Sequence, residues 1–261
     1  MRSKKQELDG LFGLMNTKFK QSRSARTFGA EQGEIADYKD SKEKLLLTWQ
    51  HVINRKTFAT GYFVGKDLVA IKEDGTIYVS AQYGGSGNLY TIKEYSDFVL
   101  RFEFCFLREG VNNGIGIRTP MGVDAAYHGM CESQILDHDD PIYGGLAPYQ
   151  VHGSVYGVIP AKRIKHKPLG QWSTEEIRVK GDHITVTVNG EVIVDGNVRE
   201  ACKGHNVAPD GGNSNPYTAD HRNHPGMFNK QGHIGFLGHG EGMKYRNVRI
   251  LDMSKGKKGK K

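Results

Sequence analysis

Residues 176–194 read EIRVKGDHITVTVNGEVIV, and this stretch decides the fold class. Apolar and polar residues alternate over 176–180, 183–188 and 191–194, which is the period of a strand with one buried face. The dipeptide Asn189-Gly190 is the strongest short-range hairpin signal, because both central positions of its turn take positive φ. The stretch therefore predicts a β-meander of three antiparallel strands with one wet face.

More strands are predicted upstream of the meander. In the run 98–106, phenylalanines at alternate positions form a core stripe. The runs 115–118 and 131–136 follow, and from Leu45 onward short apolar runs recur between glycine, asparagine and aspartate. This spacing is typical of an antiparallel sandwich. The sequence therefore predicts an all-β fold of two antiparallel sheets.

The length of 261 residues is compatible with one all-β domain. Such a domain buries about three quarters of its unfolded surface and needs no disulfide or metal to fold. We expect a polar extension over 1–44, the β-domain over 45–252 and a disordered lysine-rich tail over 253–261. Two of the three cysteines, Cys105 and Cys131, lie in strand-like runs, where a free thiol behaves as a small hydrophobe.

The net charge of +7 comes from the two ends of the chain. Residues 1–23 carry six basic and two acidic residues and residues 255–261 carry five lysines, which leaves 24–254 at −2. A nucleic-acid groove needs basic residues clustered on the folded surface, so we expect no nucleic-acid partner. No apolar stretch approaches the roughly 20 residues of a membrane span. No signal peptide is visible either.

One predicted strand carries a glycine strip, because Gly114, Gly116 and Arg118 alternate with Ile115 and Ile117. Glycines inside a strand let another molecule approach the backbone closely. An arginine at the end of such a strip is typical of a ligand-facing group. The alternative is an arginine on an edge strand that forms a surface ion pair. If Arg118 is considered without its neighbours, this alternative is favoured.

The strand 131–136 places Glu132 and Gln134 on one face. A carboxylate beside a carboxamide offers donors and acceptors in one plane, which suits sugar hydroxyls. An ordinary solvent-facing strand is the alternative. By strict alternation Asp137 falls on the opposite face from Glu132, so the two form the flanking carboxylate pair of ordinary glycosidases only if a bulge reorients one of them.

The cluster Asp137-His138-Asp139-Asp140 offers oxygen ligands on a tight loop, which suits calcium or manganese. Clustered aspartates before a proline are also ordinary turn chemistry. We expect no metal to be required and leave those two ions as the alternative.

Three of the 11 histidines, His152, His233 and His239, lie near the ends of predicted strands. His239 stands between two glycines, where an imidazole can reach into a cleft and transfer a proton. A surface histidine beside a turn is the alternative. The sequence has no Gly-x-Ser-x-Gly elbow, so serine-hydrolase chemistry is unsupported.

The order of these pieces resembles the 3-keto-disaccharide hydrolase domain family, over about residues 60–251. The resemblance rests on short motifs in the right order. They are Leu89-Tyr90-Thr91, 95–98, 112–118, 132–137, 153–157, 167–172, Asn189-Gly190, 232–235, His239-Gly240 and 245–248.

The resemblance implies a concanavalin-like jelly roll that cleaves glycosides carrying a ketone at position 3. Such a site needs a base near C2, a cation or donor for the enolate oxygen and an acid for the leaving oxygen. Catalytic candidates are Glu132, His239 and Asp137. Arg118 or Lys167 would stabilise the enolate, and hydroxyls would be placed by Asn113, Gln134, His152, Tyr156 and Arg246.

The expected partner is a small oligosaccharide or glycoside. Relatives in this family are often exported, which implies a periplasmic or secreted protein. A non-catalytic, lectin-like carbohydrate-binding module is the alternative function, because the same scaffold serves both.

Overall fold

The computed structural model describes residues 49–51, 58–63, 69–71, 76–79, 87–91, 93–238 and 242–254. The predicted extension over 1–44 and the lysines of the predicted tail lie outside the described residues. His239 lies outside them as well.

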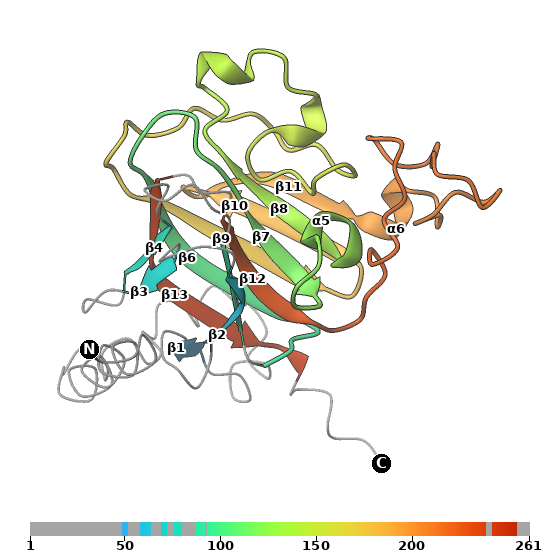
Figure 1. Ribbon diagram of the computed structural model, residues 1–261, viewed down its shortest axis with the longest axis horizontal. Helices are drawn as coiled ribbons and strands as arrows, with labels where there is room; N and C mark the ends of the chain where they lie inside the picture. Colours follow the sequence, from blue (N-terminus) through green and yellow to red (C-terminus); the bar gives the residue numbers. More distant parts are fainter. Residues whose placement is uncertain are drawn as a thin grey trace.

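Two antiparallel sheets pack face to face, as the sequence predicts (Figure 1). The larger sheet has eight strands in the order β11-β10-β9-β6-β13-β4-β3, with β1 paired to β13, and the smaller has the order β2-β5-β12-β7-β8. This arrangement is the concanavalin-like jelly-roll sandwich. The strands are β1 Trp49–His51, β2 Phe58–Phe63, β3 Val69–Ile71, β4 Ile77–Val79, β5 Gly87–Thr91, β6 Phe98–Phe106, β7 Asn112–Thr119, β8 Cys131–Leu136, β9 Ser173–Lys180, β10 His183–Val188, β11 Glu191–Asn197, β12 His233–Gly238 and β13 Met243–Asp252.

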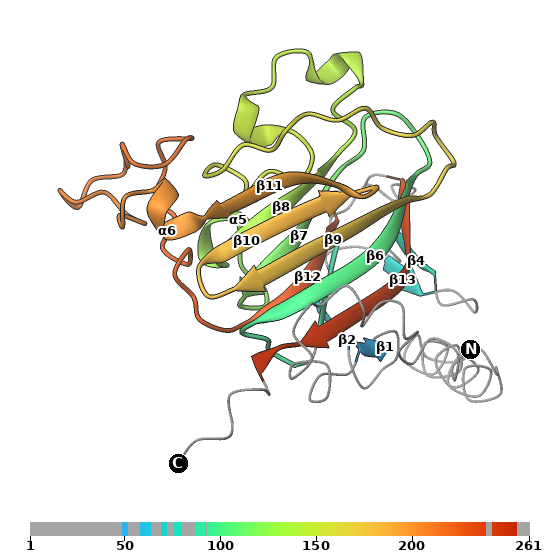
Figure 2. The ribbon, with the colours of Figure 1, turned by 180° about the vertical axis from the view of Figure 1, so that it is seen from behind.

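The meander lies at one edge of the larger sheet, where Figure 2 shows β9, β10 and β11 side by side. The hairpin between β10 and β11 has the predicted turn, since Asn189 and Gly190 have positive φ of 50° and 86°. The predicted ranges for β6 and β8 agree with the structure. Strand β9 begins earlier than its alternating run, at Ser173.

Aromatic side chains from both sheets fill the space between them. Phe102 lies edge-to-face with Phe236 of the smaller sheet at 5.9 Å between ring centroids, and with Tyr245 at 5.6 Å. Offset and edge-on rings are the favourable arrangement for such pairs. The cysteines are buried and free, as expected for Cys105 and Cys131.

The helical segments in the described part of the chain are short. They are α5 Ala125–His128, α6 Val198–Ala201 and the 3₁₀ turns η1 Pro141–Tyr143 and η2 Pro148–Gln150. No helix in the described ranges has the length and apolar character needed to cross a bilayer.

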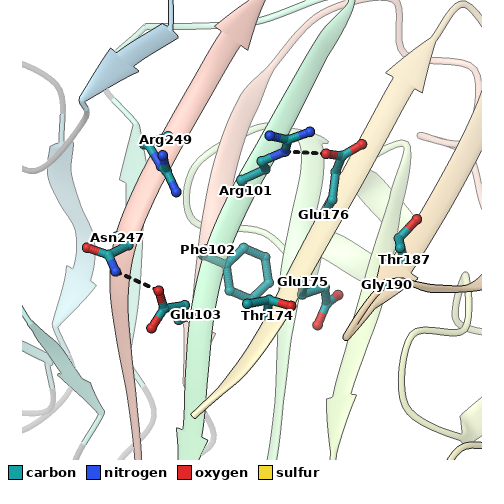
Figure 3. A pocket seen from close by; sticks show the side chains of 10 residues that line it. All are labelled: Arg101, Phe102, Glu103, Thr174, Glu175, Glu176, Thr187, Gly190, Asn247 and Arg249. Carbon is teal, nitrogen blue, oxygen red and sulfur yellow. Dashed lines mark hydrogen bonds and ion pairs between the residues drawn. The ribbon is translucent and has the colours of Figure 1, made fainter. Parts of the chain in front are cut away.

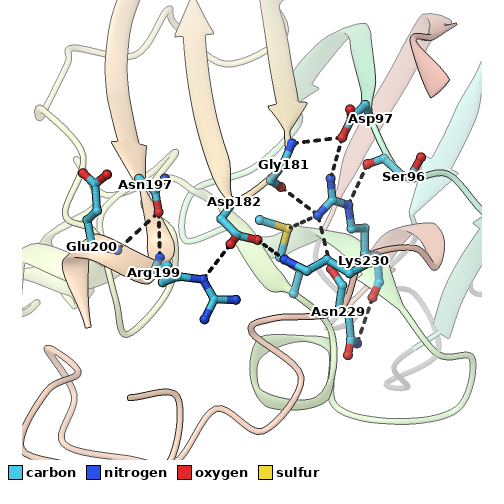
Figure 4. A network of polar contacts seen from close by, with 11 residues as sticks. Ser96, Asp97, Gly181, Asp182, Asn197, Arg199, Glu200, Asn229 and Lys230 are labelled. Atoms are coloured by element: carbon cyan, nitrogen blue, oxygen red, sulfur yellow. Dashed lines mark hydrogen bonds and ion pairs between the residues drawn. The ribbon is translucent and has the colours of Figure 1, made fainter. Parts of the chain in front are cut away.

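Arg118 is a buried clamp at the end of β7 rather than a ligand-facing group. Figure 4 shows its partners Ser96, Asp97, Gly181 and Asn229. Its Nε donates to the carbonyl of Ser96 at 2.6 Å, and its Nη1 donates to the carbonyls of Gly181 at 2.8 Å and Asn229 at 3.2 Å. Its Nη2 lies 3.2 Å from Asp97 Oδ1. This structural role of Arg118 could not be predicted from the sequence, because all its partners are remote in the chain.

His152 also lies in the interior, away from any sugar at the surface. Its Nδ1 accepts from the Leu136 amide at 3.2 Å, so the proton of the neutral ring sits on Nε2. That nitrogen lies 3.2 Å from Glu175 Oε2 on the opposite sheet. Burial lowers the pKa of His152 to about 3 and raises that of Glu175 well above its usual range. His152, in the loop after η2, and Glu175 of β9 therefore face each other in the interior as an uncharged polar pair.

We expect Arg118→Ala to lower the free energy of unfolding by about 3–5 kcal/mol, because it strands a buried carboxylate and several carbonyls. Lys230→Ala is the matched control, since it removes an exposed ion pair to Asp182 and should cost under about 1 kcal/mol. Denaturant titration measures both changes. Equal costs would show that the clamp is not structural.

Candidate active site

Glu132 and Gln134 lie on the outer face of the smaller sheet. Their neighbours Cys131 and Ile135 point into the core, so the alternate positions point outward. The strand register pairs Gly116 with Glu132 and Gly114 with Gln134.

The glycine strip is filled by the protein's own carboxyl. A Cβ added at Gly114 would lie 1.8 Å from Glu132 Oε1. At Gly116 the added Cβ would lie 3.0 Å from the Cβ of Ala125 on α5. The glycines therefore make room for Glu132 and for α5, which packs on β7 and β8.

Glu132 is only 7% exposed, and its Oε1 is buried with no hydrogen-bond partner among the described residues. Burial raises the pKa of Glu132 to about 8, with a smaller contribution from Asp124. The carboxyl group therefore keeps its proton at neutral pH. A protonated carboxyl group aimed at a site can donate to a ligand oxygen.

Asp124 caps the short helix α5 and lies close enough to Glu132 to raise its pKa. Its Oδ1 accepts from the Ala126 amide at 3.1 Å and caps α5, which packs on β7 and β8. Its charge also raises the pKa of Tyr90, for which burial is the main cause. The Tyr90 hydroxyl accepts from Asn88 Nδ2 at 2.9 Å. Two acidic groups and a phenol therefore meet at this face.

Tyrosines from two further segments lie near this end of the smaller sheet. The amide of Tyr156 donates to the Glu132 carbonyl at 3.0 Å, and its ring lies 6.0 Å from that of Tyr149 in an edge-on contact. Tyr127 of α5 lies under the Arg222 guanidinium, 4.1 Å from the ring centroid, and the two side chains are hydrogen-bonded. Burial raises the pKa of Tyr127 to about 12, and Arg222 opposes this effect.

The long segment 203–232 holds Arg222 in place through a buried histidine. His224 Nδ1 lies 2.9 Å from the Ala126 carbonyl, and its Nε2 lies 3.1 Å from both oxygens of Asp220. A Cβ at Gly157 would lie 2.4 Å from Asp220 Oδ2. Tyr127 and Arg222 could not be predicted from the sequence, because neither the residues around α5 nor the segment 203–232 has a regular hydrophobic period.

The other candidate residues are not gathered at this face. Asn113 is fully buried, with its Nδ2 2.9 Å from Met243 Sδ. Asp137 Oδ2 accepts from the Gly110 amide at 3.3 Å, and burial raises the pKa of Asp137. Asn113 therefore lies in the interior, and Asp137 holds the backbone at Gly110.

Lys167 and Arg246 lie with the larger sheet instead. Lys167 Nζ donates to the Trp172 carbonyl at 2.7 Å. The guanidinium of Arg246 lies 4.1 Å from the Trp172 ring centroid and 2.5 Å from Glu103 Oε2. Of the predicted substrate contacts, the structure brings only Gln134 and Tyr156 to the side of Glu132, and Gln134 Nε2 donates to Asn112 Oδ1 at 2.9 Å.

The aspartate loop is engaged in turn contacts. Asp139 Oδ2 accepts from the His166 amide at 3.1 Å, and Asp140 Oδ1 accepts from the Ile142 amide at 2.8 Å. His138 uses both ring nitrogens, toward the Ile164 carbonyl and the His152 amide. Within the described ranges, no group of three or more His, Cys, Asp or Glu side chains is placed to hold a metal.

Comparison with known proteins gives consistent matches. A family model described as the 3-keto-alpha-glucoside-1,2-lyase-like domain matches residues 40–251. A 3-keto-disaccharide hydrolase of Bacteroides thetaiotaomicron is 26% identical over a 230-residue alignment, and the match covers 76% of this chain and 76% of that protein. Crystal structures of two candidate glycosyl hydrolases of Parabacteroides distasonis both align with a TM-score of 0.61. One is 23% identical and covers 77% of this chain and 98% of its own, and the other is 19% identical with coverages of 82% and 97%.

Glu132→Gln should change how stability depends on pH. The wild-type carboxyl has a folded pKa of about 8 against an ordinary value of 4.5, so its stabilising contribution is lost as pH rises through that window. Thermal melts should show the variant gaining several degrees on the wild type above pH 8 and none below pH 4. The exposed control Glu200→Gln should follow the wild-type curve throughout, and a Glu132→Gln curve that also did so would refute the raised pKa.

Gly114→Ala should displace the Glu132 carboxyl, because the new methyl group overlaps it. We expect a loss of about 1–3 kcal/mol in unfolding free energy, typical of overpacking. Gly145→Ala is the control, since a Cβ there meets nothing within 4 Å. Equal stabilities for the two variants would contradict the placement of Glu132 over the strip.

Proposed function

Because the chain belongs to the 3-keto-alpha-glucoside-1,2-lyase-like family, we propose that it cleaves the glycosidic bond of 3-keto-glycosides at the Glu132 face. The match to a 3-keto-disaccharide hydrolase supports this substrate class. The observation that carries the proposal is a buried carboxyl group whose pKa is raised to about 8 on an outward-facing strand position.

The chemistry follows from the ketone. A C3 carbonyl acidifies the C2 proton, so a base removes that proton and the electron pair forms an enolate. The enolate collapses to a C1–C2 double bond as the C1–oxygen bond breaks, and the leaving oxygen takes up a proton. Water can then add across the double bond, which completes net hydrolysis.

Glu132 is proposed to supply the proton to the leaving oxygen. Its protonated form predominates at neutral pH, and a general acid works best when its pKa is close to the working pH. We propose that the carboxamide oxygen of Gln134 and the hydroxyl of Tyr156 bind sugar hydroxyls. His239 remains our candidate for the base at C2, and we propose that no metal ion is required.

The enolate needs a cation or a hydrogen-bond donor. Arg118 is enclosed by protein carbonyls, and Lys167 is bonded to the Trp172 carbonyl. Arg222 and the Tyr127 hydroxyl are therefore the better candidates. Tyr127 belongs to α5, and Arg222 is held against its ring and hydrogen-bonded to its hydroxyl.

The test compares a 3-keto-glucoside with its unoxidised parent. The protein should release the aglycone from the keto form only, and Glu132→Gln should lower kcat by about 100-fold or more with little change in KM. The wild-type rate should fall as pH rises through about 8, because the proton donor is lost. Product analysis by NMR measures release and detects the unsaturated intermediate.

Three outcomes would overturn parts of this proposal. Equal release from both glucosides would rule out the ketone-assisted route. Saturable glycan binding without turnover would favour the lectin-like alternative. Loss of activity on exhaustive chelation, restored by calcium or manganese, would contradict the proposed independence from metal.

A further inference from the structure

The opposite side of the sandwich carries a groove of about 430 Å³ that the proposed reaction does not use (Figure 3). It lies on the outer face of the larger sheet, because Arg101 and Glu103 of β6 alternate with Leu100, Phe102 and Phe104 in the core. Strands β9, β10 and β13 contribute the remaining walls. Pockets of this size accommodate small organic ligands.

Small residues make the floor of the groove. Thr174 pairs with Glu103 across β9 and β6, and Thr187 pairs with Glu176 across β10 and β9. Gly190 in the hairpin turn completes this side. The longer side chains therefore stand around a shallow, hydroxyl-lined depression.

The walls are pre-ordered pairs of donors and acceptors. Arg101 forms an ion pair with Glu176, and Figure 3 shows the two heads side by side over the strands. Glu103 accepts from Asn247 Nδ2 at 2.6 Å and from Arg246 Nε at 2.5 Å. Side chains that are already held lose less conformational entropy when a ligand binds.

The balance of charge in the groove indicates a neutral ligand. The half-buried lining groups are Arg101 and Arg249 against Glu103 and Glu176. Glu175 also borders the groove, but its side chain is in the core and burial keeps it protonated. An anion would meet the two glutamates and a cation the two arginines, whereas a sugar hydroxyl both donates and accepts.

We propose that this groove is a second, non-catalytic site for a neutral oligosaccharide. It lies on the other face of the sandwich from Glu132, so it would hold a glycan chain without blocking cleavage. This inference does not depend on the catalytic role of Glu132.

The experiment is a ¹⁵N NMR titration with unoxidised maltotriose and cellotriose, which lack the 3-ketone. We expect amide shifts on β6, β9 and β10 in the wild type and in Glu132→Gln. Thr174→Ile with Thr187→Ile removes both hydroxyls, fills the floor and keeps β-branched strand residues. This double variant should bind about tenfold more weakly.

Thr185→Ile is the matched control, because it lies on the same strand and face but outside the groove, where its hydroxyl donates to Asp195 at 3.1 Å. It should bind as the wild type does. No shifts with either trisaccharide, shifts confined to β7 and β8, or equal weakening by the control and the double variant would each overturn the proposal. Melting curves confirm that all the variants are folded.

Discussion

The burial of one carboxyl group on a strip of glycines is the constraint on which the proposed site depends. Glu132 can lie flat on β7 only because Gly114 has no side chain, and at Gly116 an added Cβ would crowd Ala125 of α5, at 3.0 Å. The burial of Glu132 removes water, which keeps the proton on the acid. The glycines of β7, the position of α5 and the raised pKa of Glu132 therefore depend on one another.

The two outer faces of the sandwich differ because the loops fall on one side. α5, the segment carrying Tyr156 and the segment 203–232 all gather near Glu132, and Figure 1 shows α5 beside β7 and β8. The face of the larger sheet in Figure 2 carries cross-strand pairs such as Arg101 with Glu176. A covered face suits chemistry that needs a desolvated acid, and an open face suits reversible binding.

Much of the fold could be predicted from local pattern. Alternation in 176–194 and the Asn189-Gly190 turn give the meander, because period and turn chemistry act over a few residues. The same rule places Glu132 and Gln134 on one face. It could not show that the glycine strip is filled from within, or that Arg118 is enclosed, since both depend on partners distant in sequence.

The central claim is that Glu132 holds its proton at neutral pH. Carbon-13 NMR of the glutamate side-chain carboxyls measures this directly, with the Glu132 signal assigned by its absence in Glu132→Gln. We expect the Glu132 signal to titrate near pH 8, with the neutral form dominant at pH 7. A signal that titrates near the ordinary glutamate value of about 4.3 would contradict it.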